Sequence, residues 1–176
     1  MGVLLFLIMI NDLRTEVPTY KYVDDTTIYR ITNEPKCPML QEATNHIIEW
    51  SSQNVMRLNA IKTKELFVCF NRFPPDVSHI TIDGAPLVRE DVITLLGLKI
   101  QSDLGWGSHI KHVVSKAQRR IYSLVMLRRA NVSPKDLVVI FCSKIRPVIE
   151  YAAQIWHPGL TVEQSNDLER IQIRAL

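Results

Sequence analysis

The alternation of hydrophobic and polar positions separates a mixed first part of the chain from a helical last part. An apolar run from Val3 to Ile10 opens the sequence and predicts a buried core helix. Two short runs rich in Tyr, Val, Ile and Thr follow at residues 19–23 and 26–31, with only Asp24 and Asp25 between them. This spacing predicts a β-hairpin that carries both acids at its turn.

The middle of the chain predicts one amphipathic helix followed by several strands. Apolar residues from Met39 to about Met56 recur at nearly helical spacing, directly after Pro38. Short apolar runs at 66–70, 80–82 and 92–100 predict strands, and Asp83-Gly84 predicts a tight turn after the second of them.

From Ser108 onward the pattern is helical. An apolar stripe between Ile110 and Val125 predicts one helix, with Lys116, Arg119 and Arg120 on the opposite face. The order of elements therefore predicts an α+β fold with a helical annex, and Gly105-Trp106-Gly107 is the expected boundary.

Helix-start signals mark two further helices. Ser133-Pro134 predicts an N-cap with proline in the first turn, and Pro147 is expected to end or kink that helix. Thr161-x-x-Gln164 predicts a capping box at the start of the last helix.

Composition indicates one globular domain, or two small subdomains that share a core. The chain has 176 residues, of which 47% are hydrophobic and 22% charged. Residues 1–106 hold 10 Lys and Arg against 13 Asp and Glu, whereas residues 107–176 hold 11 against 5. The basic excess, which is the pattern that matters for a nucleic-acid partner, therefore lies in the last part of the chain.

Cysteine usage and the apolar opening point to an intracellular protein, in cytoplasm or nucleus. The three cysteines are far apart, and none lies in a C-x-x-C pair. The apolar opening lacks a basic segment before it and is too short to cross a bilayer. We therefore expect no signal peptide, no transmembrane helix and no membrane partner.

Asp24 and Asp25 are the first candidates for chemistry. Adjacent carboxylates repel one another, and a divalent cation is a common remedy. Carboxylates that hold two hard cations are the core of two-metal nucleotidyl transfer. The alternative is an ordinary solvated turn pair, since Asp is a favoured turn residue.

A series of short motifs runs in order from residue 2 to residue 176. They are residues 2–13, Tyr22-Val23-Asp24-Asp25-Thr26, Trp50 with Asn54, Leu58-Asn59, 62–65, Leu95-Leu96-Gly97-Leu98, Leu104-x-Trp106-x-x-His109-Ile110, 116–122, 127–129, 145–151 and Trp156-His157-Pro158-Gly159. Together they resemble the reverse transcriptase of non-long-terminal-repeat, LINE-like retrotransposons.

The resemblance implies a fragment of an RNA-directed DNA polymerase. Residues 1–105 would form a partial palm, with a metal-binding hairpin and short antiparallel strands packed on helices. Residues 106–176 would form a helical thumb-like region, truncated at its C-terminus. The parent enzyme would use Mg²⁺ or Mn²⁺, dNTP and an RNA/DNA template-primer duplex.

The resemblance also implies roles for single residues. Asp24 would bind the catalytic metals directly, with Asp25 as a weaker or indirect contributor. Lys62 and Lys64 lie where the family handles the incoming nucleotide or its pyrophosphate; the alternative is a solvated loop.

Lys116, Arg119 and Arg120 would meet phosphates of the duplex; the alternative is a plain solvated helix face. Trp50 and Trp156 are expected to pack inside the protein. None of the five histidines is given a catalytic role.

The family pattern also contains parts that this sequence lacks. A further metal-binding aspartate and the fingers residues would precede Met1, so we expect weak cation binding and no polymerisation by this chain alone. Two alternatives stay open, a non-enzymatic nucleic-acid-binding remnant and a genomic relic without function.

Overall fold

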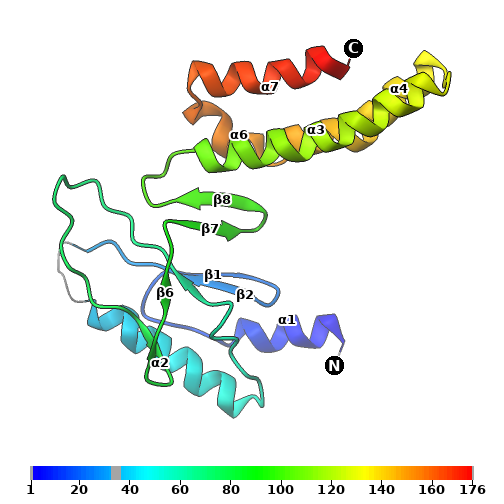
Figure 1. Cartoon of the computed structure of the whole chain (residues 1–176). Coiled ribbons are helices and arrows are strands. Elements are labelled where there is room, and N and C mark those ends of the chain that lie inside the picture. Colours follow the sequence, from blue (N-terminus) through cyan, green and yellow to red (C-terminus); the bar gives the residue numbers. More distant parts are fainter. Residues whose placement is uncertain (1, 33–36, 176) are drawn as a thin grey trace. The chain divides into compact units, whose positions relative to one another are not determined.

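The computed structural model describes residues 2–32 and 37–175, and its mixture of helices with small sheets agrees with the predicted α+β class (Figure 1). The chain divides into two compact units, which we call unit 1 (Met1–Glu90) and unit 2 (Asp91–Leu176). The palm-like and thumb-like division at residues 105 and 106 stays a prediction, because it rests on family resemblance rather than on contacts.

Unit 1 combines two helices with short strands. Its described elements are α1 (Val3–Asn11), β1 (Thr19–Tyr22), β2 (Asp25–Ile28), α2 (Pro38–Gln53), β3 (Lys64–Glu65), β4 (Thr81–Ile82), β5 (Ala85–Pro86) and β6 (Val88–Arg89). Strands β3 and β6 pair in parallel, and β4 pairs with β5 across the predicted Asp83-Gly84 turn. Both turn residues have positive φ, as a tight two-residue hairpin turn requires.

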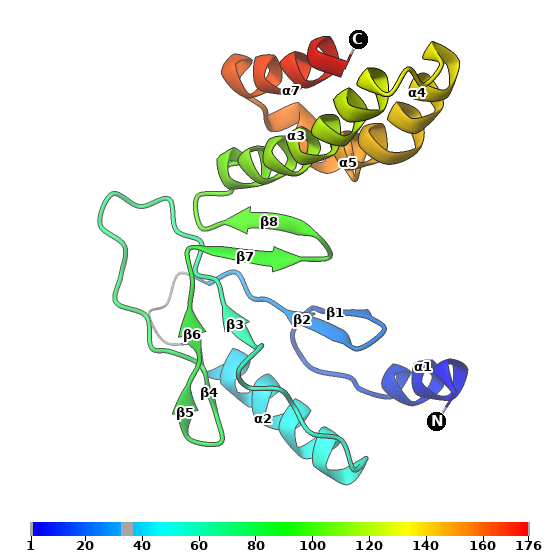
Figure 2. The ribbon, with the colours of Figure 1, turned by 45° about the vertical axis from the view of Figure 1, so that its right-hand side comes forward.

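The predicted β-hairpin is confirmed, with its turn one residue earlier than expected. Strands β1 and β2 are antiparallel and pair Tyr22 with Asp25 (Figure 2). Val23 and Asp24 therefore form the two-residue turn, and Asp25 is the first residue of β2. The expectation that both acids lie in the turn was wrong, because Asp25 takes part in strand pairing.

Helix α1 exists as predicted but is not a buried core helix. Leu4, Leu5 and Ile8 are at least 60% exposed, whereas Ile10 is buried. Ile10 of α1 forms a core cluster with Leu13 and Ile47, and the residues that pack against this cluster are Phe6 of α1, Ile28, Trp50 and Leu58. The apolar run thus forms a helix whose Leu4, Leu5 and Ile8 side chains the described residues leave exposed.

Helix α2 is confirmed, but the strand predicted at 66–70 was wrong. The ladder bonds of β3 end at Glu65, and residues 66–70 have no regular structure. A run of apolar residues becomes a strand only where a partner strand is available to satisfy its backbone groups. Gln41 connects α2 to β4: its side chain donates to the Thr81 carbonyl at 2.9 Å and accepts from the Thr81 amide at 2.8 Å.

Unit 2 begins with a hairpin and continues as helices. Its described elements are β7 (Val92–Leu95), β8 (Leu98–Gln101), α3 (Gly107–Arg129), α4 (Pro134–Ile140), the π-helical segment η1 (Phe141–Ile145), α5 (Arg146–Glu150), α6 (Ala153–Trp156), the 3₁₀ segment η2 (His157–Gly159) and α7 (Val162–Ala175). The single strand predicted over 92–100 is therefore two strands, joined at Leu96-Gly97, where both residues have positive φ.

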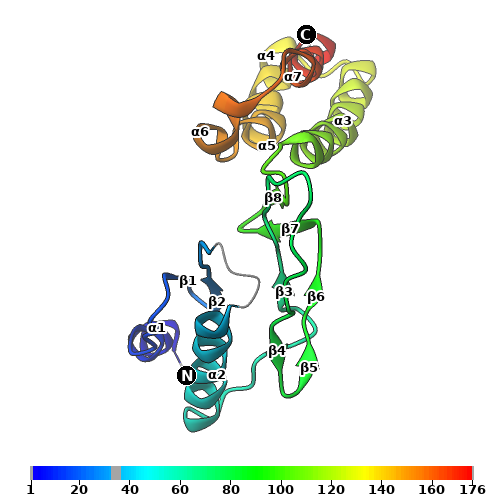
Figure 3. The same cartoon turned by 90° about the vertical axis from the view of Figure 1, so that its left-hand side faces the viewer.

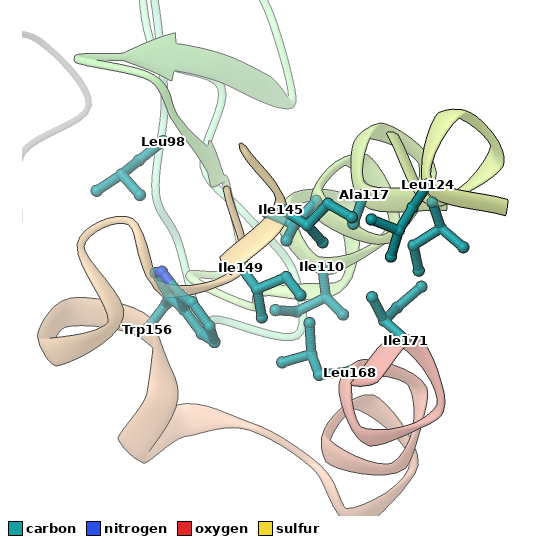
Figure 4. Packing of buried hydrophobic residues seen from close by; sticks show 11 residues of the cluster. Leu98, Ile110, Ala117, Leu124, Ile145, Ile149, Trp156, Leu168 and Ile171 are labelled. Atoms are coloured by element: carbon teal, nitrogen blue, oxygen red, sulfur yellow. The ribbon is translucent and has the colours of Figure 1, made fainter. Parts of the chain in front are cut away.

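A contiguous hydrophobic core holds unit 2 together. Helices α3, α5 and α7 enclose it (Figure 3), and the close-up in Figure 4 shows their side chains meeting. The buried members are Leu98, Ile110, Val113, Ala117, Ile121, Leu124, Ile145, Ile149, Trp156, Leu168 and Ile171. Trp156 is only 2% exposed, so its prediction as a packing residue is confirmed.

The predicted helix starts in unit 2 are confirmed. The Ser133 hydroxyl accepts from the Asp136 amide at 3.2 Å. Thr161 and Gln164 form the reciprocal capping box, with distances of 3.2 and 3.0 Å. The helix started at Ser133 widens into η1 directly before Arg146-Pro147, because proline cannot donate the next backbone hydrogen bond.

Candidate metal hairpin and nucleic-acid interface

The β1–β2 hairpin is fixed to α1 by a lysine that sequence reasoning missed. The Lys21 ammonium donates to the carbonyls of Ile10 at 2.9 Å, Asn11 at 3.3 Å and Leu13 at 2.8 Å. Carbonyls at a helix C-terminus lack intrahelical partners and carry partial negative charge, which a cation satisfies. Lys21 therefore holds β1 against the end of α1.

The two candidate metal ligands are adjacent in sequence at the end of this hairpin. Asp24 is in the turn, Asp25 opens β2, and both are exposed. Val23 before them has a φ of 56°, a backbone conformation that costs a β-branched residue about 1–2 kcal/mol. Within residues 2–32 and 37–175, no three His, Cys, Asp or Glu side chains gather as a metal-binding group.

An aromatic face accompanies the acids. Side chains alternate along β1, so Tyr20 and Tyr22 lie on the face opposite Lys21 and are exposed. Tyr20 stacks on Tyr29 with ring centroids 5.9 Å apart. A hydrogen bond with Tyr20 raises the pKa of Tyr29, and Coulombic interaction with Tyr20 and burial act in the same direction.

The two lysines predicted to handle nucleotide have different surroundings. Lys62 is exposed in the loop after α2, and its amide is held by the Asn59 side chain at 3.1 Å. Lys64 lies in β3 and forms an ion pair with Glu90 at 2.9 Å. Lys64 already has a carboxylate partner, so Lys62 is the better candidate to meet a phosphate.

The three cations predicted on α3 do not share one free face. Lys116 and Arg119 are exposed. The guanidinium of Arg120 donates instead to the Lys144 carbonyl in η1, so this residue connects two segments of unit 2. Arg120 therefore has a structural contact that its helical position alone did not predict.

Two histidines on α3 lie near these cations. Burial lowers the pKa of His112, and the positive charges of Lys99, Lys116 and Arg119 lower it further. His112 is nevertheless exposed, one turn before Lys116.

His109 is buried between Trp106 and Trp156, with ring centroids 5.9 and 5.7 Å away. Its Nδ1 accepts from the Lys99 amide at 3.3 Å, and its buried Nε2 has no hydrogen-bond partner among the described residues. Burial lowers the pKa of His109, with smaller contributions from His112 and Lys99.

The cysteines are unpaired in the structure, and its described helices do not meet the requirements for crossing a membrane. Cys37, Cys69 and Cys142 are free. Across the part of the chain that the structure describes, no helix combines the length and the apolar character needed to cross a membrane.

Comparison with known proteins supports a relationship to reverse transcriptases. The chain is similar to a Drosophila melanogaster protein named "Probable RNA-directed DNA polymerase from transposon BS". The two sequences are 22% identical over 160 residues, which cover 88% of this chain and 17% of the relative. No family model matches the chain, and no solved structure matches it.

Proposed function

We propose that the chain is a palm-and-thumb segment of the RNA-directed DNA polymerase of a LINE-like retrotransposon. The observation that carries this proposal is the pair Asp24-Asp25 at the end of the β1–β2 hairpin, within a chain similar to a transposon polymerase over most of its length. A hairpin end presents adjacent carboxylates to solvent without burying their charge, as a site for a hydrated cation needs.

The donor set fits Mg²⁺ or Mn²⁺. Asp24 and Asp25 offer hard oxygen ligands, and both are exposed, so water can complete the coordination. In two-metal nucleotidyl transfer the cations activate the attacking oxygen and stabilise the leaving oxygen. Lys21 and the α1 carbonyls keep the hairpin in place, and Lys62 offers a cation for the phosphates of a dNTP.

We propose that the 176-residue chain by itself does not polymerise nucleotides. Two carboxylates on one hairpin form one side of a two-metal clamp, and the family pattern supplies the opposing aspartate from an upstream strand. With one side only, we expect cation binding with a Kd of about 1 mM or weaker.

Paramagnetic Mn²⁺ tests the metal site in the full chain. We expect selective broadening of the amide signals of residues 22–26 in NMR spectra, because these lie next to the two carboxylates. The double variant Asp24→Asn/Asp25→Asn should lose this broadening. Asp83→Asn, at another exposed hairpin turn of unit 1, is the matched control and should keep the broadening of residues 22–26. Broadening that survives the double variant would refute the assignment.

A second proposed function, duplex binding by α3, has its own support. Unit 2 contains 12 Lys and Arg against 7 Asp and Glu, and Lys116 and Arg119 are exposed on its longest described helix. Phosphate contacts of this kind give salt-dependent binding that is indifferent to sequence.

Salt titration of binding to an RNA–DNA duplex tests this function. The variant Lys116→Ala/Arg119→Ala should bind more weakly, and its slope of log affinity against log salt should fall by about 1.8, or about 0.9 for each lost contact. Arg128→Ala/Arg129→Ala removes the same charge from exposed positions at the end of the same helix and is the control. Equal loss in both variants would mean that net charge, rather than this face, binds the duplex.

A further inference from the structure

Strand β8 adds a cation to the face of α3. Leu98 of β8 is buried in the same core cluster as Ile110 and Val113 of α3. The next residue, Lys99, donates its amide to His109 Nδ1 at 3.3 Å. These contacts fix the position of Lys99 beside the turn of α3 that contains His109.

His112 lies between the cations that this packing brings together. It follows His109 by three residues and precedes Lys116 by four, so both are its neighbours along the helix surface, and Arg119 follows one turn beyond. Lys99, Lys116 and Arg119 are all close enough to act electrostatically on its ring. Three cations from two elements therefore act on one exposed imidazole.

We propose that Lys99, His112, Lys116 and Arg119 form a phosphate-binding surface on unit 2, and that protonation of His112 strengthens its binding to a nucleic-acid duplex. This inference rests on the proposed duplex binding by α3 and extends it to β8 and to pH. The partner is a phosphodiester backbone, because clustered cations attract the charged phosphates of a duplex whatever its sequence.

The chemistry of imidazole explains why protonation of His112 should strengthen phosphate binding. A neutral ring donates one hydrogen bond, whereas an imidazolium donates two and adds a charge. Without a ligand, burial and the three cations disfavour the charged form and lower the pKa of His112. A bound phosphate neutralises those cations and attracts the imidazolium, so it raises the same pKa.

The direction of the pH dependence follows from this difference. The complex has the higher pKa and therefore takes up a proton that the free protein does not hold. Affinity should rise as pH falls through the pKa of the complex and level off below the pKa of free His112, which lies under the ordinary value of about 6.5. The buried His109 on the same helix also titrates, so it must be separated from His112 by mutation.

Fluorescence anisotropy with the full chain and an RNA–DNA duplex of about 20 base pairs tests the proposal, at constant ionic strength and with a dye that does not titrate. Between about pH 7.5 and pH 5.5 we expect the affinity of the natural chain to rise about tenfold, since one charged phosphate contact is gained. The duplex affinity of the His112→Gln variant should change less than twofold over the same pH range. His46→Gln, at an exposed position on α2, is the matched control and should behave as the natural chain does.

The outcomes separate the two proposals. No binding by the natural chain at either pH would refute the proposed duplex binding itself. Binding whose pH dependence survives His112→Gln would overturn only the role of His112. As a check that does not depend on a variant, the NMR titration of the His112 ring should give a higher pKa in the complex than in the free chain. An unchanged pKa would overturn the proposal.

Discussion

Lys21, Gln41 and Arg120 each donate to a backbone carbonyl of another secondary-structure element. Such contacts depend on which segments pack together, so residue type and helical spacing could not predict them. The sequence did identify Asp24 and Asp25 as a pair, because adjacency is local. It misplaced Asp25 by one position, since the register of the hairpin decides which residues turn.

The buried His109 should make the stability of the protein depend on pH. Its folded pKa lies below the ordinary value of about 6.5 because it is buried, so the unfolded chain binds more protons around that pH. The free energy of unfolding should therefore decrease as pH falls from about 7.5 to 5.5, a range above the titration of ordinary carboxyl groups. His112 contributes in the same direction.

Urea unfolding at these two pH values measures the effect. His109→Phe removes the titrating ring while keeping an aromatic side chain between the tryptophans, so it should show a smaller loss of stability at low pH. His46→Gln should retain the full loss. A natural chain that is equally stable at both pH values would show that neither histidine is held neutral by the fold.

Among elements, the long periodic segments, the capped helices and the β1–β2 hairpin were predictable, whereas the strand at 66–70 and the single strand over 92–100 were predicted wrongly. The α2 and α3 patterns and the Ser133 and Thr161 caps depend on neighbours within a few residues. The run at 66–70 has strand composition but no partner strand. The run at 92–100 folds as a hairpin because Gly97 can adopt the positive φ of a turn.

Gly97 forms the β7–β8 turn close to the ring of Tyr151. Its φ is 83°, and a Cβ there would lie 3.3 Å from the Tyr151 ring, whose hydroxyl donates to the Leu96 carbonyl at 2.8 Å. Gly97→Ala should therefore destabilise unit 2 by more than the roughly 1 kcal/mol expected for backbone strain alone. Denaturant unfolding of Gly97→Ala measures this cost.

A double-mutant cycle with Tyr151→Ala isolates the steric part. In the Tyr151→Ala background the cost of Gly97→Ala should fall towards the strain term, because the ring is gone. Gly84→Ala, with a φ of 77° and open space around the Cβ, gives the strain term by itself. Equal costs with and without the Tyr151 ring would rule out the contact.

For the whole molecule, the order of motifs predicted the relationship to reverse transcriptases, which the contacts within the structure do not show. The 22% identity to a transposon RNA-directed DNA polymerase supports the relationship to reverse transcriptases that the order of motifs predicted. The compact units divide after Glu90, so the β7–β8 hairpin belongs with the helices that its Leu98 contacts. Hydrophobic patterns mark where elements form, but they do not say which elements pack together, so this boundary could not be read from the sequence.

Helix α1 presents exposed apolar side chains. Leu4, Leu5 and Ile8 are apolar as in a core helix, yet the described residues leave them exposed. The sequence predicted their helix correctly and their burial wrongly, because burial depends on the covering segments and these are not encoded in the helix itself.

Primer extension on a poly(rA) template with an oligo(dT) primer, in Mg²⁺ or Mn²⁺, is the most direct test of the claim that Asp24 and Asp25 form one side of a two-metal site. We expect no extension by the 176-residue chain, although we propose that the hairpin binds a cation weakly. Robust extension that Asp24→Asn abolishes would contradict this claim, because it would show that these residues hold a complete catalytic site.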